Sequence, residues 1–396
     1  MEEHPQARYI IDTLAKAGFV AYYAGGWVRD FLLGHPSDDI DIATNAPPET
    51  IQVLFPRTVP IGIAFGIILV IVDGHQYEVA TFRNDLDYKD GRRPTRVEFT
   101  TAVEDAKRRD FTINGMFYDP LKGEILDFVG GREDLDRKVI RAIGNPHERI
   151  KEDRLRMIRG VRLACRFHFA IDPDTAKAIR THAKELFPAV AIERIVQEFE
   201  KGHAFGKLRP MLIQLHEFEL LQTIFPDLKE ELNLEAAGQY PHNAPLIAFL
   251  LQLFPDYTLR DQLHLCKILK LPNHDAQFTT FLFRAKELLI RPVELIEWAY
   301  FYADRFSTIT LQILAAHQKN KEAFLQEHEQ RIALLQSSIQ RIHAHDPVVK
   351  SDDLIKIGVE PGKQMGQLLK EAERIAINEQ IYDKEQILNR IYDQNL

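Results

Sequence analysis

The sequence predicts an α+β protein: a head that surrounds an antiparallel or mixed sheet, followed by an all-α body. Up to about residue 145, short apolar runs of strand length alternate with amphipathic segments of helical period. Beyond that point, apolar residues recur at three- and four-residue spacing, which is typical of helices that bury one face. A chain of 396 residues is long enough for more than one domain.

Composition indicates a globular protein with an ordinary core. Hydrophobic residues make up 45% of the chain and charged residues 27%. The net charge of −8 argues against a protein that coats nucleic acid without specificity. Two isolated cysteines exclude a disulfide framework or a thiolate zinc site, and the longest apolar stretch, residues 61–72, is too short to span a membrane. Because the N-terminus also lacks an apolar signal core, we expect a cytoplasmic protein.

Local signals predict the elements of the head. Gly34 ends a short helix, because glycine is favoured just after a helix C-terminus. Asn45 before a proline pair is typical of a helix start. Asp73 and Gly74 between two apolar runs predict a tight hairpin turn. The predicted elements are a helix over 7–17, a strand over 19–24, a helix over 28–33, a strand over 39–43, a helix beginning near 45, and strands over 67–72 and 77–82.

A charged segment, residues 83–94, follows the hairpin. It contains few apolar side chains, so its composition is compatible with a disordered connector. The alternative is a mobile loop that works beside a phosphorylated ligand, because catalytic groups are often carried on loops. The sequence leaves both possibilities open.

The rest of the chain is predicted to be helical. Basic residues are concentrated between residues 145 and 170, where they form either a contact for a polyanion or a solvated helix face. The tail beyond residue 319 is rich in charges and predicts helices with much exposed surface. Helical periodicity is clearest over 152–167, 174–185, 191–199, 208–216 and 263–269.

Asp39 and Asp41 form the most informative local pattern. Two carboxylates at alternate positions of a strand point to the same face, and oxygen ligands of this kind suit Mg²⁺. Gly25 and Gly26 let the backbone approach a bulky anion, and Arg29 adds a fixed positive charge. Each feature alone is usually a turn. Their combination within one segment predicts a phosphate-and-metal site.

A second cluster contains Arg109, Asp110 and Asn114. Arginine binds phosphate oxygens bidentately, and aspartate or asparagine can hold a ribose hydroxyl. The alternative is a basic surface turn before a helix capped by Asp110 or Thr112. The cluster therefore indicates either nucleotide contact or a capped turn.

A third cluster places Arg156, Arg159 and Arg162 at three-residue intervals after Asp153. On one continuous helix these side chains would form a curved ridge. Asp153 and Arg156 then form either an intrahelical ion pair of little energetic value or a base-reading pair. Cytosine and adenine both present an amine donor beside a ring-nitrogen acceptor, which a carboxylate and a guanidinium match; uracil and guanine present the opposite pattern.

In this order the three clusters resemble the class II tRNA nucleotidyltransferases, a family of CCA-adding enzymes and bacterial poly(A) polymerases. The resemblance is close over residues 20–170 and general over the helical remainder. The matching motifs are residues 25–34 with 39–44, residues 108–114, residues 119–120 with 127–135, and residues 152–159.

The resemblance implies a polymerase-beta-like nucleotidyltransferase head over residues 1–145, a helical neck over 146–205, and a tRNA-binding body and tail over 206–396. Asp39 and Asp41 would be catalytic carboxylates that hold Mg²⁺ in a two-metal scheme, with Glu78 as a supporting third. The implied nucleotide-binding residues are Gly25, Gly26 and Arg29 at the triphosphate, Arg109, Asp110 and Asn114 at the nucleotide and its ribose, Asp153 and Arg156 at the base, and Arg159 and Arg162 completing the pocket.

The resemblance also implies template-independent addition of CCA to the 3′ end of tRNA from CTP and ATP, with release of pyrophosphate. The segment 83–94 argues against a CC-only enzyme, which lacks such a loop, but A-only enzymes keep it. A tail that is not strongly basic favours CCA addition over poly(A) synthesis. A noncatalytic RNA-binding protein and small-molecule nucleotidyl transfer are more distant alternatives.

Two His-Asp pairs, at residues 274–275 and 345–346, raise the question of an appended phosphohydrolase activity. Such an activity needs further spaced His and Asp ligands, so we expect these pairs to lie at helix ends or in loops. The sequence gives no indication of a protein partner or of a membrane contact.

Overall fold

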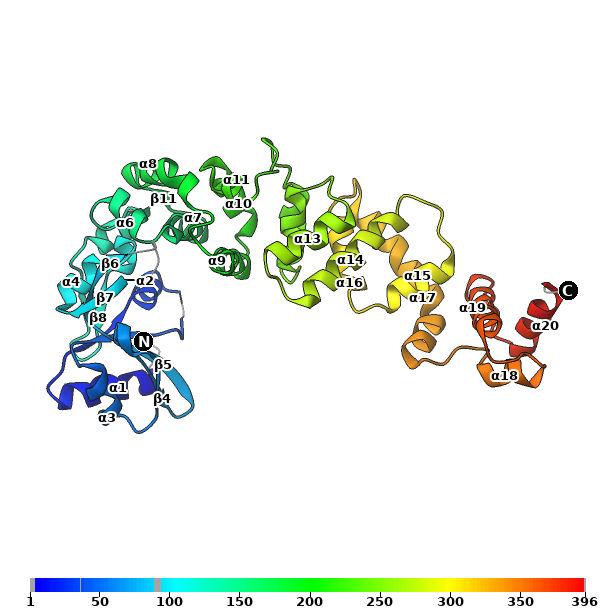
Figure 1. The fold of residues 1–396 in the computed structure, drawn as a ribbon, viewed down its shortest axis with the longest axis horizontal. Coiled ribbons are helices and arrows are strands. Elements are labelled where there is room, and N and C mark those ends of the chain that lie inside the picture. Colours follow the sequence, from blue (N-terminus) through cyan, green and yellow to red (C-terminus); the bar gives the residue numbers. More distant parts are fainter. Residues whose placement is uncertain (1–3, 36, 89–93, 395–396) are drawn as a thin grey trace. The chain divides into compact units, whose positions relative to one another are not determined.

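The computed structural model describes residues 4–35, 37–88 and 94–394 (Figure 1). The chain divides into two compact units, Met1–Lys229 and Glu230–Leu396. The first unit holds the sheet and the helices that follow it, and the second is built from helices. The division into head, neck and body at residues 145 and 205 stays a prediction.

A seven-stranded mixed sheet organises the described part of the first unit. Strand β1 lies antiparallel to both β2 and β8, whereas β2 lies parallel to β5. The sheet and the helical remainder confirm the predicted fold class. In order across the sheet the strands are β3 (Thr58–Gly62), β4 (Ile67–Val72), β5 (His75–Thr81), β2 (Asp41–Thr44), β1 (Ala21–Ala24), β8 (Phe117–Asp119) and β9 (Glu124–Leu126).

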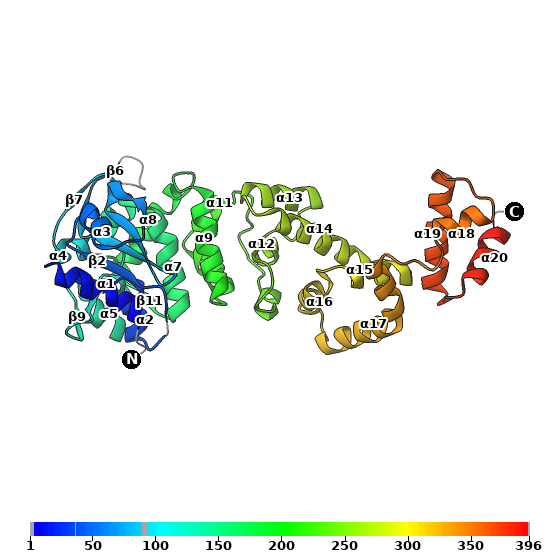
Figure 2. The same cartoon turned by 90° about the horizontal axis from the view of Figure 1, so that it is seen from below.

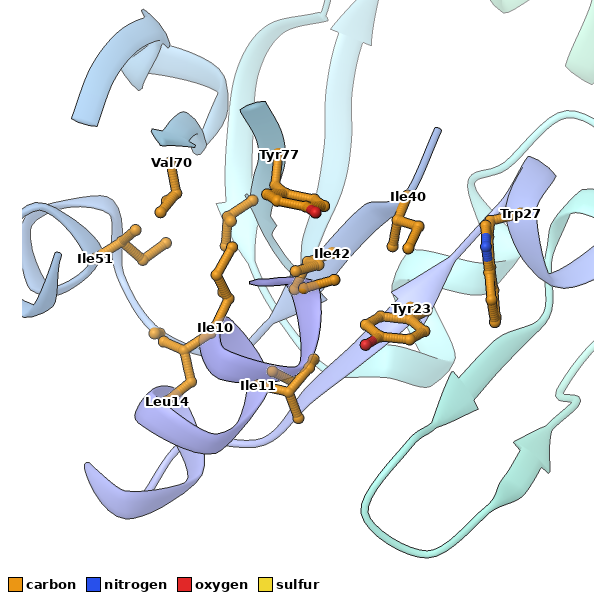
Figure 3. Packing of buried hydrophobic residues seen from close by; sticks show 14 of the residues in the cluster. Ile10, Ile11, Leu14, Tyr23, Trp27, Ile40, Ile42, Ile51, Val70 and Tyr77 are labelled. Atoms are coloured by element: carbon orange, nitrogen blue, oxygen red, sulfur yellow. The ribbon is translucent and has the colours of Figure 1, made fainter. Parts of the chain in front are cut away.

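A core on one side of the sheet sets the direction of the acidic side chains. Ile40 and Ile42 are buried in the same apolar cluster as the inward face of helix α1 (Pro5–Lys16), as Figure 3 shows. Side chains alternate along an extended chain, so Asp39 and Asp41 point away from this core. Burial of an isoleucine side chain contributes roughly 1.5–3 kcal/mol, which makes a one-residue slip of this strand costly.

Strands β4 and β5 form the predicted hairpin. Val72 pairs with His75 across a two-residue turn. Asp73 and Gly74 both have positive φ, 49° and 83°, as the tight turns that suit strand twist require. The Asp-Gly signal in the sequence is therefore confirmed.

The charged segment after the hairpin forms paired strands, so its described part is not a disordered connector, and its role as a loop beside a phosphorylated ligand stays a prediction. Strands β6 (Arg83–Tyr88) and β7 (Pro94–Phe99) are antiparallel, with Arg83 opposite Phe99. The pairing was missed because these strands carry no regular apolar alternation, and backbone hydrogen bonds leave no signal in the sequence. Residues 89–93 of the expected loop lie outside the described residues.

The helices that follow the sheet agree with the predicted periodicity, with one correction. The predicted helix over 152–167 is interrupted, because Asp153 has an extended backbone with φ −146° and ψ 105°. Helix α7 packs against α9 (Figure 2) and also against α10 within the first unit. The remaining helices of this unit are α2 (Gly26–Leu32), α3 (Pro48–Leu54), α4 (Ala102–Lys107), α5 (Gly131–Asp136), α6 (Pro146–Glu152), α7 (Leu155–Phe167), α8 (Pro173–His182), α9 (Ile192–Ala204), α10 (Leu208–Glu217) and α11 (Leu220–Ile224).

The second unit consists of helices and their connections. His274 lies in the first turn of α14 and His345 follows the last residue of α17, so both occupy the expected helix ends. In the described part of the chain, no helix is long and apolar enough to cross a membrane. The helices are α12 (Leu246–Leu250), α13 (Leu259–Ile268), α14 (Asn273–Leu288), α15 (Leu295–Ala303), α16 (Ser307–Ala315), α17 (Lys321–Ala344), α18 (Ser351–Lys356), α19 (Lys363–Asn378) and α20 (Lys384–Gln394).

A buried histidine makes the stability of the second unit depend on pH. His328 is 2% exposed, and its ring accepts or donates a 2.7 Å hydrogen bond with the Tyr302 hydroxyl. Burial, and then the charge of Arg331, lower the pKa of His328 from 6.5 to about 4. The unfolded chain therefore binds a proton at pH values where the folded chain does not, so stability is complete above pH 6.5 and is lost as the pH falls towards 4.

We expect the unfolding free energy of the second unit to fall by roughly 3 kcal/mol between pH 7 and pH 4 through this histidine. Urea unfolding followed by tryptophan fluorescence measures this slope. His328→Gln should flatten it, whereas the exposed His264→Gln should leave it unchanged. Equal slopes in the two variants would contradict the assignment.

Candidate active site

Every site residue predicted from the sequence lines one cavity of about 790 Å³ in the first unit. Ten arginine or lysine side chains and five carboxylates line it, on a chain whose net charge is −8. Such a cavity attracts a polyanion. The predicted residues gathered there are Gly25, Gly26, Arg29, Asp39, Asp41, Glu78, Arg109, Asp110, Asn114, Asp153, Arg156, Arg159 and Arg162.

The carboxylates come from two neighbouring strands. Asp41 is the first residue of β2, which begins two residues later than predicted, so Asp39 lies in the segment that leads into it. Ile42 pairs with Val79 across the parallel strands, and Asp41 and Glu78 precede this pair on their strands. Asp39, Asp41 and Glu78 therefore line the same cavity, and the charges of Asp39 and Glu78 act on Asp41.

Partial burial and neighbouring negative charges raise the pKa of Asp41. Its side chain is open to the cavity, but surrounding protein atoms desolvate it in part. This desolvation, followed by the charges of Asp39 and Glu78, raises the pKa of Asp41 to about 6, and Arg109 opposes the rise. A bound cation would relieve the repulsion.

The donor set at this position fits a divalent cation. Carboxylate oxygens are hard ligands, and Mg²⁺ is commonly held by one or two of them together with substrate phosphates. Among the described residues, no group of three His, Cys, Asp or Glu side chains is placed to hold a metal ion. Asp39 and Asp41 can thus supply two ligands, while the role of Glu78 as a third stays a prediction.

Gly25 allows the backbone to pass close to the cavity. Its φ is +67°, and a Cβ built there would lie 3.1 Å from the Arg109 Nη1 and 3.7 Å from Oδ2 of Asp41. Gly26 begins helix α2, and the next turn carries Arg29. A larger residue at Gly25 would therefore fill the space between the Arg109 guanidinium and the Asp41 carboxylate.

Arg29 is held in place before any ligand binds. It is 4% exposed, and its guanidinium donates to Asp30 at 2.9 Å and to the Asn114 Oδ1 at 2.5 Å. Burial lowers the pKa of Arg29 to about 10, which leaves it charged at neutral pH. Asp30 also accepts from Arg166 at 3.0 Å, so the sheet-side helix α2 is tied to α7.

Asp110 anchors the second predicted cluster. Its carboxylate accepts from the Asn114 side chain at 3.1 Å and from the Arg159 Nε at 2.8 Å. Burial by itself would raise the pKa of Asp110, but Arg159 and Asn114 hold it well below its ordinary value. Arg109 pairs with Asp105 of α4 at 3.0 Å. The alternative of a basic surface turn is wrong, because Asp110 and Asn114 are both buried.

The intrahelical ion pair considered for Asp153 and Arg156 does not form, and their role as a base-reading pair stays a prediction. Asp153 lies in the break between α6 and α7, where it accepts from the Leu155 backbone at 3.1 Å and pairs with Arg194 of α9 at 2.7 Å. Arg156 instead bonds Glu152 at 2.6 Å and donates to two backbone carbonyls. The arginine ridge of α7 is correct, but the acid beside it comes from outside the helix.

Two residues of α9 that the sequence analysis missed hold charged groups of the cavity wall in place. Arg194 fixes Asp153, and Glu198, only 1% exposed, accepts from Arg162 at 2.5 Å and lies 3.9 Å from Arg159. Residue spacing within α9 gives no hint of these contacts, because each spans more than thirty residues of sequence. Further lining residues missed by the sequence analysis are Arg83, Arg108, Arg166, Lys201 and Phe205.

Comparison with known proteins places the chain in a family. The family model described as "Poly A polymerase head domain" matches residues 21–141, and the one described as "Probable RNA and SrmB- binding site of polymerase A" matches residues 168–232. A protein named CCA-adding enzyme from Enterococcus faecalis is 35% identical over 400 residues, covering 98% of this chain and 95% of the relative. The chain belongs to the CCA-adding enzyme family.

A further relative and a solved structure support the same family assignment. The CCA-adding enzyme of Anoxybacillus flavithermus is 40% identical over 277 residues, covering 69% of this chain and 68% of the relative. The crystal structure of the Bacillus stearothermophilus CCA-adding enzyme in complex with CTP superposes with a TM-score of 0.81 at 30% identity, covering 99% of this chain and 98% of that one. Membership confirms the resemblance seen in the motifs and implies the use of a divalent metal.

We expect Gly25→Ala to lower the affinity for CTP by about tenfold or more, because the new Cβ displaces Arg109 and forfeits a charge-assisted hydrogen bond. Gly123→Ala is the matched control, since Gly123 also has positive φ, +72°, but its Cβ meets nothing within 4 Å. Both variants should lose about 1–2 kcal/mol of stability from the left-handed backbone. Calorimetric titration with CTP compares the affinities of the two variants. Equal affinities would refute the close approach of the Gly25 backbone to Arg109.

Proposed function

We propose that this chain adds C and A nucleotides to the 3′ end of tRNA, taking them from CTP and ATP without a template and releasing pyrophosphate. The observation that carries the proposal is the meeting, in one cavity, of Asp39 and Asp41 with Asp153 and Arg156. The first pair suits a reaction at a phosphate, and the second suits a choice of base. The relatives named CCA-adding enzymes support this activity over A-only addition and poly(A) synthesis.

Asp39 and Asp41 would hold the divalent cation, which we propose to be Mg²⁺. When bound, such an ion stabilises charge on the phosphates and lowers the pKa of the attacking hydroxyl. In the transfer, the 3′ oxygen of the RNA bonds to the α-phosphorus, the bond from that phosphorus to pyrophosphate breaks, and the hydroxyl proton is lost to solvent. Glu78 would act through its charge on Asp41.

The arginines would bind the triphosphate at little entropic cost. Arg29 is already fixed by Asp30 and Asn114, and Arg109 by Asp105. A side chain that is ordered before binding loses less freedom when the ligand arrives. Asp110 and Asn114 would then meet the ribose, and Arg159 and Arg162 would complete the pocket.

The base would be chosen by fixed hydrogen-bonding groups. Arg194 holds both carboxylate oxygens of Asp153, and Oδ1 also accepts from the Leu155 backbone. Oδ2 keeps room for a further donor such as the exocyclic amine of cytosine or adenine. Arg156 is held by Glu152 and by backbone carbonyls, and its remaining N–H groups would donate to the ring nitrogen. Uracil and guanine present the opposite pattern, so that a carbonyl oxygen would face the Asp153 carboxylate and an N–H would face the Arg156 guanidinium. Leaving these partly buried groups without hydrogen-bond partners costs free energy.

The helical remainder, residues 206–396 in our division, would bind the tRNA. Proteins recognise folded RNA largely by shape and by contacts to the phosphate backbone, for which an extended helical surface is suited. We propose a cytoplasmic location, because the substrate is tRNA and both cysteines, Cys165 and Cys266, are free thiols.

Three tRNA primers test the activity, ending before CCA, after C and after CC, each incubated with Mg²⁺ and with CTP or ATP alone. We expect C on the two shorter primers and A on the CC-ended primer. Incorporation of A alone on the CC-ended primer would identify an A-only enzyme, and unlimited A addition a poly(A) polymerase. Asp39→Asn with Asp41→Asn should lower incorporation by about a thousandfold or more while tRNA binding persists.

Arg156→Ala should lower the preference for CTP over UTP by about tenfold, because one good hydrogen-bonded base contact is worth about 1–3 kcal/mol. Arg154→Ala is the control. Arg154 immediately precedes α7, pairs with Glu185 at 3.0 Å and is not among the residues that line the cavity. Incorporation rates with CTP and UTP in competition give the ratio. An unchanged ratio in Arg156→Ala would remove this residue from base selection.

A further inference from the structure

A second cavity, of about 750 Å³, is lined by residues of the second unit, none of which is assigned to catalysis. Its wall is formed by the end of α14 and by parts of α15, α16 and α17, which Figure 1 labels in the second unit. Cavities of 300–1,000 Å³ with apolar walls and a few polar groups are typical of small-molecule sites. Nothing in the proposed activity uses this one.

Lys286, in the last turn of α14, is the unusual group in the wall. Among the described residues its ammonium has no hydrogen bond or ion pair, although burial lowers the pKa of Lys286 below its ordinary value. A partly buried charge without a partner is costly and calls for an anion.

The other two cations of the wall already have carboxylate partners. Arg291 pairs with Glu297, and Arg331 pairs with Glu327 at 2.5 Å while its guanidinium lies 4.7 Å from the centre of the Trp298 ring. Among the residues that the structure describes, Lys286 is therefore the one cation of this wall without a carboxylate partner.

Glu327, the partner of Arg331, also lines the wall, and the remaining lining residues are apolar or uncharged. Leu289, Val293 and Phe324 give it hydrocarbon surface. His317 also lines it, and burial together with the charge of Lys286 lowers the pKa of His317, so that its ring is neutral at pH 7. A ligand suited to this wall has one acidic head and an apolar body.

We propose that this cavity binds an organic anion, with its acidic head on Lys286 and its apolar body against Leu289, Val293 and Phe324. The ligand class is a compact aromatic or aliphatic phosphate, sulfonate or carboxylate. The site is independent of nucleotidyl transfer, so its failure leaves the proposed activity untouched.

Anilinonaphthalene sulfonate is the probe, titrated into the full-length protein and followed by fluorescence. We expect saturable binding at one site, weakened about tenfold or more in Lys286→Met and within threefold of wild type in Lys286→Arg, because a hydrogen bond to a charged group is worth about 1.5–3 kcal/mol. Lys267→Met is the matched control, since Lys267 is an exposed lysine of α13 in the same unit. Equal affinities in Lys286→Met and Lys267→Met would overturn the proposal.

A second measurement does not depend on the folding of a variant. Pyridoxal phosphate forms an imine with an unprotonated amine, releasing water, and borohydride reduces the imine to a stable amine that mass spectrometry locates. We expect Lys286 to be labelled before Lys267 and Lys270, and excess anilinonaphthalene sulfonate to protect it. Labelling without preference, or without protection, would contradict an anion site at Lys286.

Discussion

The buried ion pairs between α7 and its neighbours are the constraint on which the catalytic cavity depends. Arg159 reaches Asp110 beside the sheet, and Arg162 reaches Glu198 on α9. The coulombic attraction of Asp110 raises the pKa of Arg159 even though burial opposes the rise. Helix α7 is thus tied on one side to the segment after α4, which carries Asp110, and on the other to α9, the helix that fixes Asp153.

This arrangement explains how so many like charges share one wall. Most guanidinium groups that face the cavity are backed by a carboxylate, as Arg109 is by Asp105 and Arg29 is by Asp30. The cations are held in position by partners behind them, and their remaining donors stay directed at the ligand. Asp39 and Asp41 differ from these arginines, because the charge of Asp39 repels that of Asp41. A bound cation would offset this repulsion.

The sequence predicted what local patterns determine. The two-residue spacing of Asp39 and Asp41 predicted that they share one face, and the arginine spacing predicted the ridge on α7. It could not predict the partner of Asp153, because Arg194 is 41 residues away and enters only through the packing of α9 on α7. The same holds for Glu198. The break before α7 was missed because apolar periodicity continues across it.

The most direct test of this account is a double-mutant cycle on Arg162 and Glu198, measured as the free energy of unfolding of the first unit in urea. Arg162→Met and Glu198→Gln should each cost about 3–5 kcal/mol, because each leaves a buried charge without its partner. The loss of unfolding free energy in the double variant should be smaller than the sum of the two single losses, by about 2 kcal/mol or more. Additive costs would show that the pair does not hold α7 to α9 and would contradict the account.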